Sequence, residues 1–337
     1  MTSDDTVSLD HGAGGKASHA LFSEIILPLF HNDQLAQQDD GAVCEVPAGR
    51  LAFSTDSYVV DPIFFNGGNI GDLAVNGTVN DIAMCGAQPL FISVGLIIEE
   101  GLPKKDLQKI LKTMARAADQ AGVKIVTGDT KVVPRGKADK IFINTSGIGI
   151  IPEGVNVSGT RALPKDKIII SGTIADHGMA ILSAREGLAF ESDLKTDSAP
   201  LHGMVKSLLD AGCEIHVLRD PTRGGLGTTL NEIAAGSRVG ITLFESALPV
   251  KGQVKGMCEL LGFDPLYIAN EGKLIAIVPE HDAGRVLEII QADPFGTDAA
   301  IIGEVTDHLP GKVFLETAIG GRRMVDMLTG EQLPRIC

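Results

Sequence analysis

The amino-acid sequence predicts an α/β (α+β layered) protein with two domains, and three observations support this prediction. The chain has 337 residues, of which 44% are hydrophobic, so it can bury more than one core. Apolar runs typical of strands alternate with segments whose apolar residues recur at helical spacing. Proline, glycine and charged residues cluster near 158–165, around GTRALPKDK, and separate two such alternating blocks.

These breaks divide the chain into four parts. We expect a flexible, glycine-rich N-terminal arm over 1–40, an N-terminal domain over 41–160, a C-terminal α+β domain over 161–308 and a C-terminal segment over 309–337. The arm is polar and carries only a weak helical pattern, which predicts a mobile segment. The apolar periodicity fades after KVFLET, and this predicts that the last dozen residues form a loose, flexible tail.

The N-terminal domain begins with strand-like segments at 43–46 and 50–55. A glycine-bounded helix near 68–86 and a buried apolar strand at 89–98 follow. The clearest helix covers 103–121, where Pro103 suits the first turn and one face carries Leu107, Ile110, Leu111, Met114, Ala117, Ala118 and Ala121. Strands at 123–129 and 140–151 complete this block.

The C-terminal domain opens with a buried strand at 167–171 and again alternates between helical and strand-like patterns. The expected helices lie near 176–186, 202–212, 222–237 and 281–291, and the expected strands at 241–244, 273–278 and 299–305. This alternation predicts a second layered domain.

The charge balance makes nucleic acid a poor ligand for this chain. Lysine and arginine number 29 against 43 aspartate and glutamate, a net charge of −14, which repels phosphate backbones and anionic lipid. Aromatic residues make up only 4%, which leaves few surfaces for stacking bases. No apolar stretch approaches the roughly 20 residues that span a bilayer, and the start MTSDDTVSLD lacks the bases of a secretory signal. We therefore expect a cytoplasmic protein with neither nucleic-acid nor membrane partners.

A glycine cluster near the N-terminus is a candidate phosphate loop. Gly12, Gly14, Gly15 and Lys16 could form a nest of backbone amides around an anion. The cluster is not a Walker A loop, because Asp10 stands where the first glycine should be. A flexible terminal loop is the alternative reading.

Aspartates at predicted strand ends or in glycine-flanked turns indicate a magnesium nucleotide site. They are Asp40, Asp56, Asp81, Asp129 and Asp220. Carboxylate oxygens suit Mg²⁺, and ligands bind at strand ends in α/β folds. Each aspartate could instead close a turn or cap a helix.

Three further residues are candidates for chemistry, each with a plainer alternative. Lys131 could meet phosphate, or act as a base if desolvation lowers its pKa, or be a surface lysine. Glu271, between Asn270 and Gly272, could be a general base or a turn residue. Cys337 is the last residue of the chain, and a terminal thiol is sterically open and can reach a cleft or another protein.

The motifs, taken in order, carry a family resemblance. They are HGAGGK, DDGAV, STD, VNDIAMCGAQP, TGDTKVV, DHG, RDPTRGG, NEG and the closing PRIC. Over nearly its whole length the chain resembles the superfamily of aminoimidazole ribonucleotide synthetase and selenophosphate synthetase, and within it most closely the HypE carbamoyl dehydratases of nickel–iron hydrogenase maturation. Selenophosphate synthetases carry a reactive Cys or Sec in the glycine loop, which HGAGGK lacks, whereas PRIC is the hallmark of the HypE family.

This resemblance implies a two-domain PurM-like fold and a homodimer whose N-terminal sheets join in a barrel-like core. It implies ATP and Mg²⁺ in a cleft between the domains, with the glycine loop and Gly128, Asp129 and Thr130 at the nucleotide. The metal carboxylates it implies are Asp40, Asp56, Asp81 and Asp220, and only the family pattern favours Asp40 over Asp39.

The resemblance also implies an activity. The carbamoyltransferase HypF would load a carbamoyl group onto Cys337, and ATP-dependent dehydration would turn it into a thiocyanate. Lys131 and Glu271 would help to remove the amide protons, and cyanide would pass to iron on the HypC–HypD complex. The alternatives are a small-molecule ATP-dependent synthetase of the same superfamily and a non-catalytic ATP-binding carrier.

Overall fold

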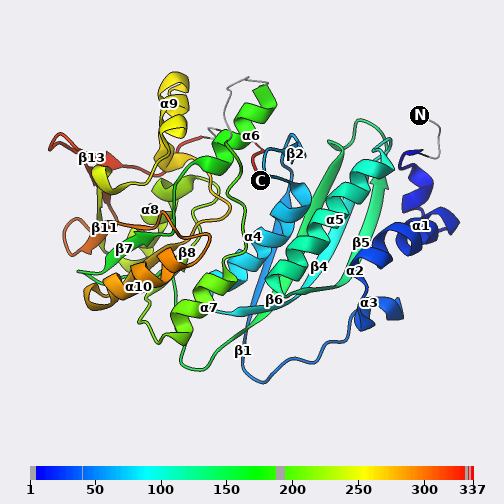
Figure 1. The fold of residues 1–337 in the computed structure, drawn as a ribbon, viewed down its shortest axis with the longest axis horizontal. Helices are drawn as coiled ribbons and strands as arrows, with labels where there is room; N and C mark the ends of the chain where they lie inside the picture. The colour runs from blue at the N-terminus through cyan, green and yellow to red at the C-terminus, as the bar shows by residue number, and fades with distance from the viewer. Residues whose placement is uncertain (1–4, 40, 187–193, 331–332, 334) are drawn as a thin grey trace.

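The computed structural model describes residues 5–39, 41–186, 194–330, 333 and 335–337. Figure 1 shows two layered domains side by side, with the C-terminus between them and helix α1 at the far edge of the first domain. The predicted fold class is therefore confirmed.

The first domain is built on one mixed sheet. Within the described residues it has four strands in the order β1-β6-β4-β5, antiparallel except for the parallel pair β4 and β5. Helices α4 and α5 cover one face, as Figure 1 shows. The bounds are β1 Arg50–Tyr58, α4 Ile70–Met84, β4 Gln88–Glu99, α5 Lys104–Ala121, β5 Lys124–Val133 and β6 Ile141–Ile151, with a small ribbon of β2 Phe64–Phe65 and β3 Gly68–Asn69.

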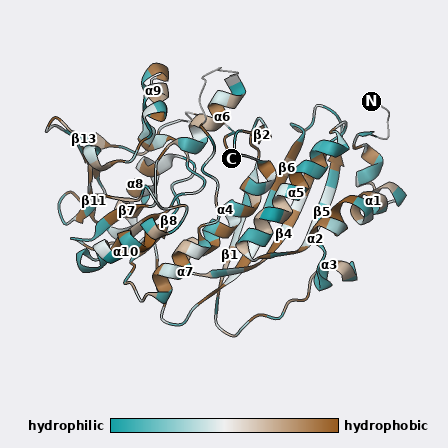
Figure 2. Cartoon of the chain, viewed as in Figure 1, coloured by the Kyte–Doolittle hydropathy of each residue, from teal (hydrophilic) through white to brown (hydrophobic). Residues whose placement is uncertain are grey.

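The amphipathic pattern of α5 explains its place. Its seven predicted core residues are all buried against the sheet and α4. Pro103 precedes the helix as its N-cap rather than lying in the first turn, and Gly122 ends it with a left-handed backbone, φ 65°. Figure 2 shows α5 with both hydrophilic and hydrophobic residues, as expected for a helix that separates a core from solvent.

The expected mobile arm is folded instead. Residues 5–37 form short helices, α1 Lys16–Leu21, α2 Leu27–Phe30 and α3 Asp33–Gln37, which pack beside β5 and α5. Val7, Leu21 and Phe30 belong to the core of the first domain, and this burial is what orders the segment. The expected strand at 43–46 is absent, because that segment makes no strand pairing among the described residues.

The second domain surrounds a sheet whose seven described strands follow the order β13-β12-β9-β11-β7-β10-β8. Its strands are β7 Lys167–Ile170, β8 Val217–Arg219, β9 Gly240–Phe244, β10 Ile275–Val278, β11 Ala300–Thr306, β12 Val313–Glu316 and β13 Arg322–Val325. Its helices are α6 Asp176–Glu186, α7 His202–Asp210, α8 Gly225–Ser237, α9 Gly252–Leu261 and α10 Glu280–Ala292. The expected helix at 222–237 starts three residues later and that at 202–212 ends two residues earlier, and the elements that were not predicted are α9, β8, β12 and β13.

The isoleucine run of β7 shows why this domain has two covered faces. Ile168 and Ile170 pack in the core beneath α8, whereas Ile169 points to the opposite core beneath α7 and α10. Side chains alternate across a strand, so a continuous apolar run requires helices on both faces.

The described C-terminal residues are docked rather than loose. Leu333 and Ile336 are buried in the core shared with α6, and an oxygen of Cys337 accepts a hydrogen bond from the Val59 amide at 3.0 Å. Residues 331, 332 and 334 lie outside the described part of the chain.

Candidate functional site

A cavity of about 550 Å³ lies at the β5 edge of the first sheet, beneath the N-terminal helices. It brings the glycine loop to the predicted nucleotide residues, because Gly12 and Gly14 line it together with Gly128, Asp129 and Thr130. Gly15 and Lys16 are exposed and are not among its lining residues. Asp40 lies outside the described residues, whereas its neighbour Asp39 lines the cavity. The cavity belongs to the first domain and not to a cleft between the domains.

Two glycines make this cavity sterically feasible. A Cβ on Gly12 would lie 2.6 Å from the Val132 backbone nitrogen, so only glycine lets the turn at Leu9–Gly12 rest on β5. A Cβ on Gly128 would lie 2.4 Å from the Val94 carbonyl oxygen. Both contacts are too short for any side chain.

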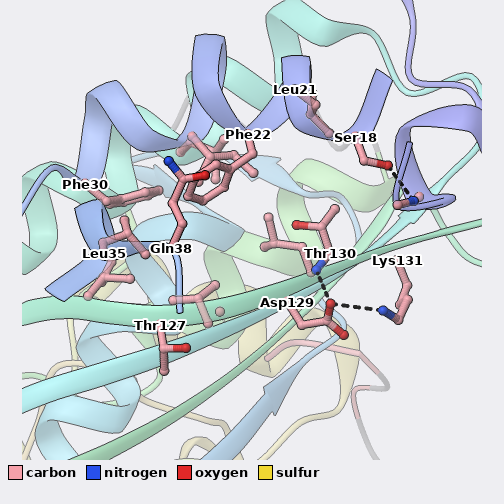
Figure 3. Close-up of a pocket in the computed structure, with 18 of the residues that line it drawn as sticks. Ser18, Leu21, Phe22, Phe30, Leu35, Gln38, Thr127, Asp129, Thr130 and Lys131 are labelled. Carbon is pink, nitrogen blue, oxygen red and sulfur yellow. Dashed lines mark hydrogen bonds and ion pairs between the residues drawn. The ribbon is translucent and has the colours of Figure 1, made fainter. Parts of the chain in front are cut away.

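The cavity has an apolar side and a polar side, as Figure 3 shows. Leu21, Phe22, Phe30 and Leu35 line one side and Asp129, Thr130 and Lys131 the other. The Thr130 amide donates to Asp129 Oδ1 at 2.9 Å, and Lys131 Nζ lies 3.0 Å from the same oxygen. The Lys131 side chain is 64% exposed, so the desolvation considered for a base at this position is absent from this conformation. This arrangement suits a ligand with a flat apolar part and an anionic part.

A second group of predicted residues gathers where the two domains meet, next to β1. We call it the carboxylate cluster, and it consists of Asp56, Asp81, Asp220 and Glu271. Asp56 accepts a hydrogen bond from the Tyr58 hydroxyl at 3.0 Å, and Asp81 accepts one from the Ser54 hydroxyl at 2.5 Å. The Glu271 carbonyl accepts from Asn80 Nδ2 at 3.3 Å, which places it beside the turn of α4 that carries Asp81.

Only Asp220 follows a strand end as the sequence predicted. Asp81 lies inside α4, and Asp56 lies within β1. They meet because α4 packs across β1, so that Asp81 faces Ser54. A strand-end rule cannot anticipate a helix that crosses a sheet.

Burial and neighbouring charges disfavour ionisation of Asp81, Asp220 and Glu271. Burial, with the charge of Asp81, raises the pKa of Asp220 to about 7. Burial also raises the pKa of Asp81, against the lowering effect of the Ser54 hydrogen bond. Glu271 is 4% exposed, and burial together with the charge of Asp220 raises its pKa well above the usual value. Its Oε1 has no hydrogen-bond partner among the described residues. A cation would relieve this repulsion.

The cavity and the carboxylate cluster stand at opposite edges of the sheet. The strand register aligns Asp56, Thr145, Val94 and Gly128 in one row across β1, β6, β4 and β5. Because neighbouring strands lie about 4.8 Å apart, this row separates Asp56 from Gly128 by about 14 Å. Within one chain, Glu271 and Cys337 therefore lie on the β1 side and Lys131 lies on the β5 side.

Residues that the sequence reasoning missed hold the chain terminus. His177 of the DHG motif is fully buried in α6, and its Nε2 lies 2.6 Å from the Ile336 carbonyl oxygen. Arg185, at the other end of α6, also contacts the terminal segment. The DHG motif could have drawn attention to His177, but the residue that it contacts, Ile336, lies 159 positions further along the chain.

Both halves of the chain match known families. The AIR synthase related protein N-terminal domain matches residues 38–151, and the corresponding C-terminal domain matches residues 164–316. The carbamoyl dehydratase HypE of Azotobacter vinelandii is 54% identical over 332 residues, covering 98% of this chain and 97% of that protein.

Solved structures agree in fold. A crystal structure of the hydrogenase maturation protein HypE in complex with ATP superposes with a TM-score of 0.96 at 53% identity, over 98% of this chain and 100% of that chain. The HypE chain matched in a HypE–HypF complex has a TM-score of 0.81 at 50% identity, over 92% and 100%. With such identity over nearly the full length, the chain belongs to the HypE family of carbamoyl dehydratases, whose two domains are those of the AIR synthase related proteins.

Proposed function

We propose that this protein uses ATP to dehydrate a carbamoyl group carried on Cys337 to a thiocyanate, which supplies the cyanide ligand of nickel–iron hydrogenase. The observation that carries this proposal is the position of Cys337, which is bound beside the end of β1. The carboxyl end of Cys337 binds next to Tyr58, whose pKa is raised by burial and by the charges of Asp56 and Glu271. This position brings the last residue of the chain to the end of β1, the strand that carries Asp56.

The chemistry balances with ATP as the activator. The carbamoyl oxygen attacks the γ-phosphorus, the bond to ADP breaks, and a phosphorylated imidate, S–C(OPO₃)=NH, forms as one N–H proton leaves. Loss of phosphate and of the second N–H proton gives S–C≡N. Phosphorylation converts a poor leaving oxygen into a good one, and positioning supplies most of the catalysis.

Glu271 is suited to take up an amide proton. Its burial makes its carboxylate a stronger base than an exposed glutamate, and Oε1, which lacks a hydrogen-bond partner within the described part of the chain, would accept a hydrogen bond from substrate. Lys131 lines the cavity on the opposite edge and would meet phosphate oxygens as a cation.

The cavity at β5 suits ATP, the nucleotide present in the crystal structure of a HypE relative. Its apolar side would receive the base, and the backbone of Gly12, Gly14 and Gly128 would allow close approach of the triphosphate.

Magnesium fits the carboxylate cluster by the chemistry of its donors. The oxygens are hard ligands, and a divalent cation would offset the burial and the neighbouring negative charge that raise the pKa values of Asp220 and Asp81. No three His, Cys, Asp or Glu side chains among the described residues form a group able to hold a metal ion by themselves. Asp56, Asp81 and Asp220 would therefore share Mg²⁺ with the phosphates, and the ion would neutralise charge on the triphosphate.

A homodimer would unite the two edges. Helices cover one face of the first sheet, whereas the other face exposes Leu51, Phe53 and Ile97 by 53%, 70% and 44%. Two such faces packed in a barrel-like core would bury these side chains. If the β5 edge of one copy lies beside the β1 edge of its partner, Lys131 approaches the partner subunit's carboxylate cluster.

The partners of the family complete the proposal. HypF, seen in complex with a relative, would load Cys337, and the HypC–HypD scaffold would receive the cyanide. No described helix is both long and apolar enough to cross a bilayer, and we propose that the protein works in the cytoplasm.

Mass spectrometry of the C-terminal peptide tests the function. After incubation with HypF, carbamoyl phosphate and ATP, the peptide should carry the carbamoyl group and then lose the mass of one water, and a nonhydrolysable nucleotide should prevent the loss. A small-molecule synthetase would keep its activity in Cys337→Ala, and a carrier would hold the carbamoyl group without losing water. Either result would overturn the proposal.

A further inference from the structure

The last residues of the chain pair with the segment that follows β1. The Val59 amide donates to an oxygen of Cys337 at 3.0 Å, and the Asp61 amide donates to the Arg335 carbonyl at 3.2 Å. The Arg335 side chain returns a bond from Nε to the Val59 carbonyl at 3.0 Å. The terminus is therefore held in one register along residues 59–61.

Two side chains of α6 fix this pairing from the other side. Arg185 donates from Nη2 to the Arg335 carbonyl at 2.8 Å, and from Nε and Nη2 to the Asp61 carbonyl at 2.9 and 2.7 Å. Its guanidinium thus bridges the terminal segment and the segment on which that segment lies. Such a planar fork fits two carbonyls in a way that a lysine cannot.

His177 holds the carbonyl between these two contacts. A carbonyl only accepts, so His177 Nε2–H donates to Ile336 O, at 2.6 Å, and Nδ1 accepts from the Thr196 hydroxyl, at 2.7 Å. The Thr196 oxygen in turn accepts from the Ser198 amide. Burial lowers the pKa of His177, which keeps the ring in the neutral form that this network requires.

Every described backbone carbonyl of the terminal tripeptide 335–337 thus has a donor from α6 or from residues 59–61. The peptide bonds are fixed even though only one of the three side chains, Ile336, is buried. Such contacts do not read the side chain of Cys337. They position whatever group its sulfur carries.

We infer that His177 and Arg185 form a tail clamp, a pair of positioning residues that seats the terminal tripeptide for dehydration and that must release it before another protein can load the thiol. This inference rests on the proposed function. It predicts opposite effects on two half-reactions, because a weaker clamp lowers the docked fraction and raises the free fraction. A residue with a merely structural role would slow both.

Arg185→Gln is the main test, with Arg116→Gln on the exposed surface of α5 as its matched control. A hydrogen bond to a charged group stabilises enough that its loss changes an equilibrium by about tenfold. In Arg185→Gln we expect alkylation of Cys337 by iodoacetamide, followed on the C-terminal peptide, to be about tenfold faster. Dehydration of pre-carbamoylated protein should be slower at saturating ATP, but by a smaller factor because the docked fraction starts near one, while loading by HypF is unchanged or faster.

His177→Gln and His177→Leu give a second arm. The glutamine amide can still donate to the Ile336 carbonyl and should retain most of the dehydration rate, whereas leucine should behave like Arg185→Gln. Circular dichroism and ATP binding identify variants that do not fold. If the His177 variants do not fold, the comparison of Arg185→Gln with Arg116→Gln tests the inference.

The inference fails if alkylation of Cys337 is unchanged in Arg185→Gln, or if loading and dehydration fall together. Failure of the proposed function is a separate result, because it would appear as absence of ATP-dependent water loss in the unmodified protein. The alkylation rates need no ATP and report on the clamp alone.

Discussion

Replacing Asp220 by asparagine should stabilise the protein while it removes activity. Burial and the charge of Asp81 raise the pKa of this carboxyl from 3.8 to about 7. Three units at about 1.4 kcal/mol each give an upper bound of about 4 kcal/mol for the cost of ionising it in the folded state. Because the side chain is only half-buried, solvent screening reduces the expected gain to about 1–2 kcal/mol.

The stabilisation expected for Asp220→Asn depends on pH. Between the unfolded pKa, near 4, and about 7, the folded state holds more protons at Asp220 than the unfolded state, so the unmodified protein loses stability as pH rises. Asp220→Asn removes that loss. The free energies of unfolding of the two proteins should be similar near pH 4.5 and differ most at pH 8.

Urea denaturation at both pH values, with EDTA present, measures the difference. Asp119→Asn, at an exposed position of α5, is the control and should change stability by less than about 0.5 kcal/mol. Added Mg²⁺ should stabilise the unmodified protein more than the variant. An asparagine variant that is less stable than the parent at pH 8 would refute the reasoning, because the carboxylate would then be making favourable contacts.

Three further predictions concern the base, the cavity and the open sheet face. Glu271→Gln should slow dehydration by about a hundredfold or more, the range of general-base catalysis, while ATP binding measured by calorimetry is retained; a slowing of less than tenfold would contradict the assignment. Gly128→Ala should lower stability by about 1–3 kcal/mol in thermal unfolding, because its Cβ would meet a β4 carbonyl, whereas Gly15→Ala, with no atom near its Cβ, should not. Phe53→Glu should give monomers in analytical ultracentrifugation without loss of fold, and dimers that persist would argue against pairing through this face.

The local patterns of the sequence predicted most of the elements. The spacing of apolar residues located α5, β4 and β7, because a helix or strand that is buried on one or both faces carries apolar residues at a characteristic period. The motifs of the chain and its terminal cysteine indicated the family, which the comparisons confirm. The pattern failed at 5–37, where weakly amphipathic helices gain their order from packing against the sheet.

The residue types of the site could also be predicted from the sequence, but their arrangement in space could not. Asp81 and Asp56 were singled out as residues at strand ends or in glycine-flanked turns, yet they meet because a helix crosses a strand. The separation of Lys131 from Glu271 follows from strand order, which is set by pairings between segments far apart in the chain.

The sequence by itself determined the chemistry available to this protein: carboxylates, glycine loops, and a thiol on its last residue. The tertiary structure alone decided where these groups stand. It placed the nucleotide loop and the carboxylates at opposite edges of one sheet and seated the terminal tripeptide against His177 and Arg185. The physical reason is that periodicity records which face of an element is buried, whereas register and docking depend on hydrogen bonds between distant segments.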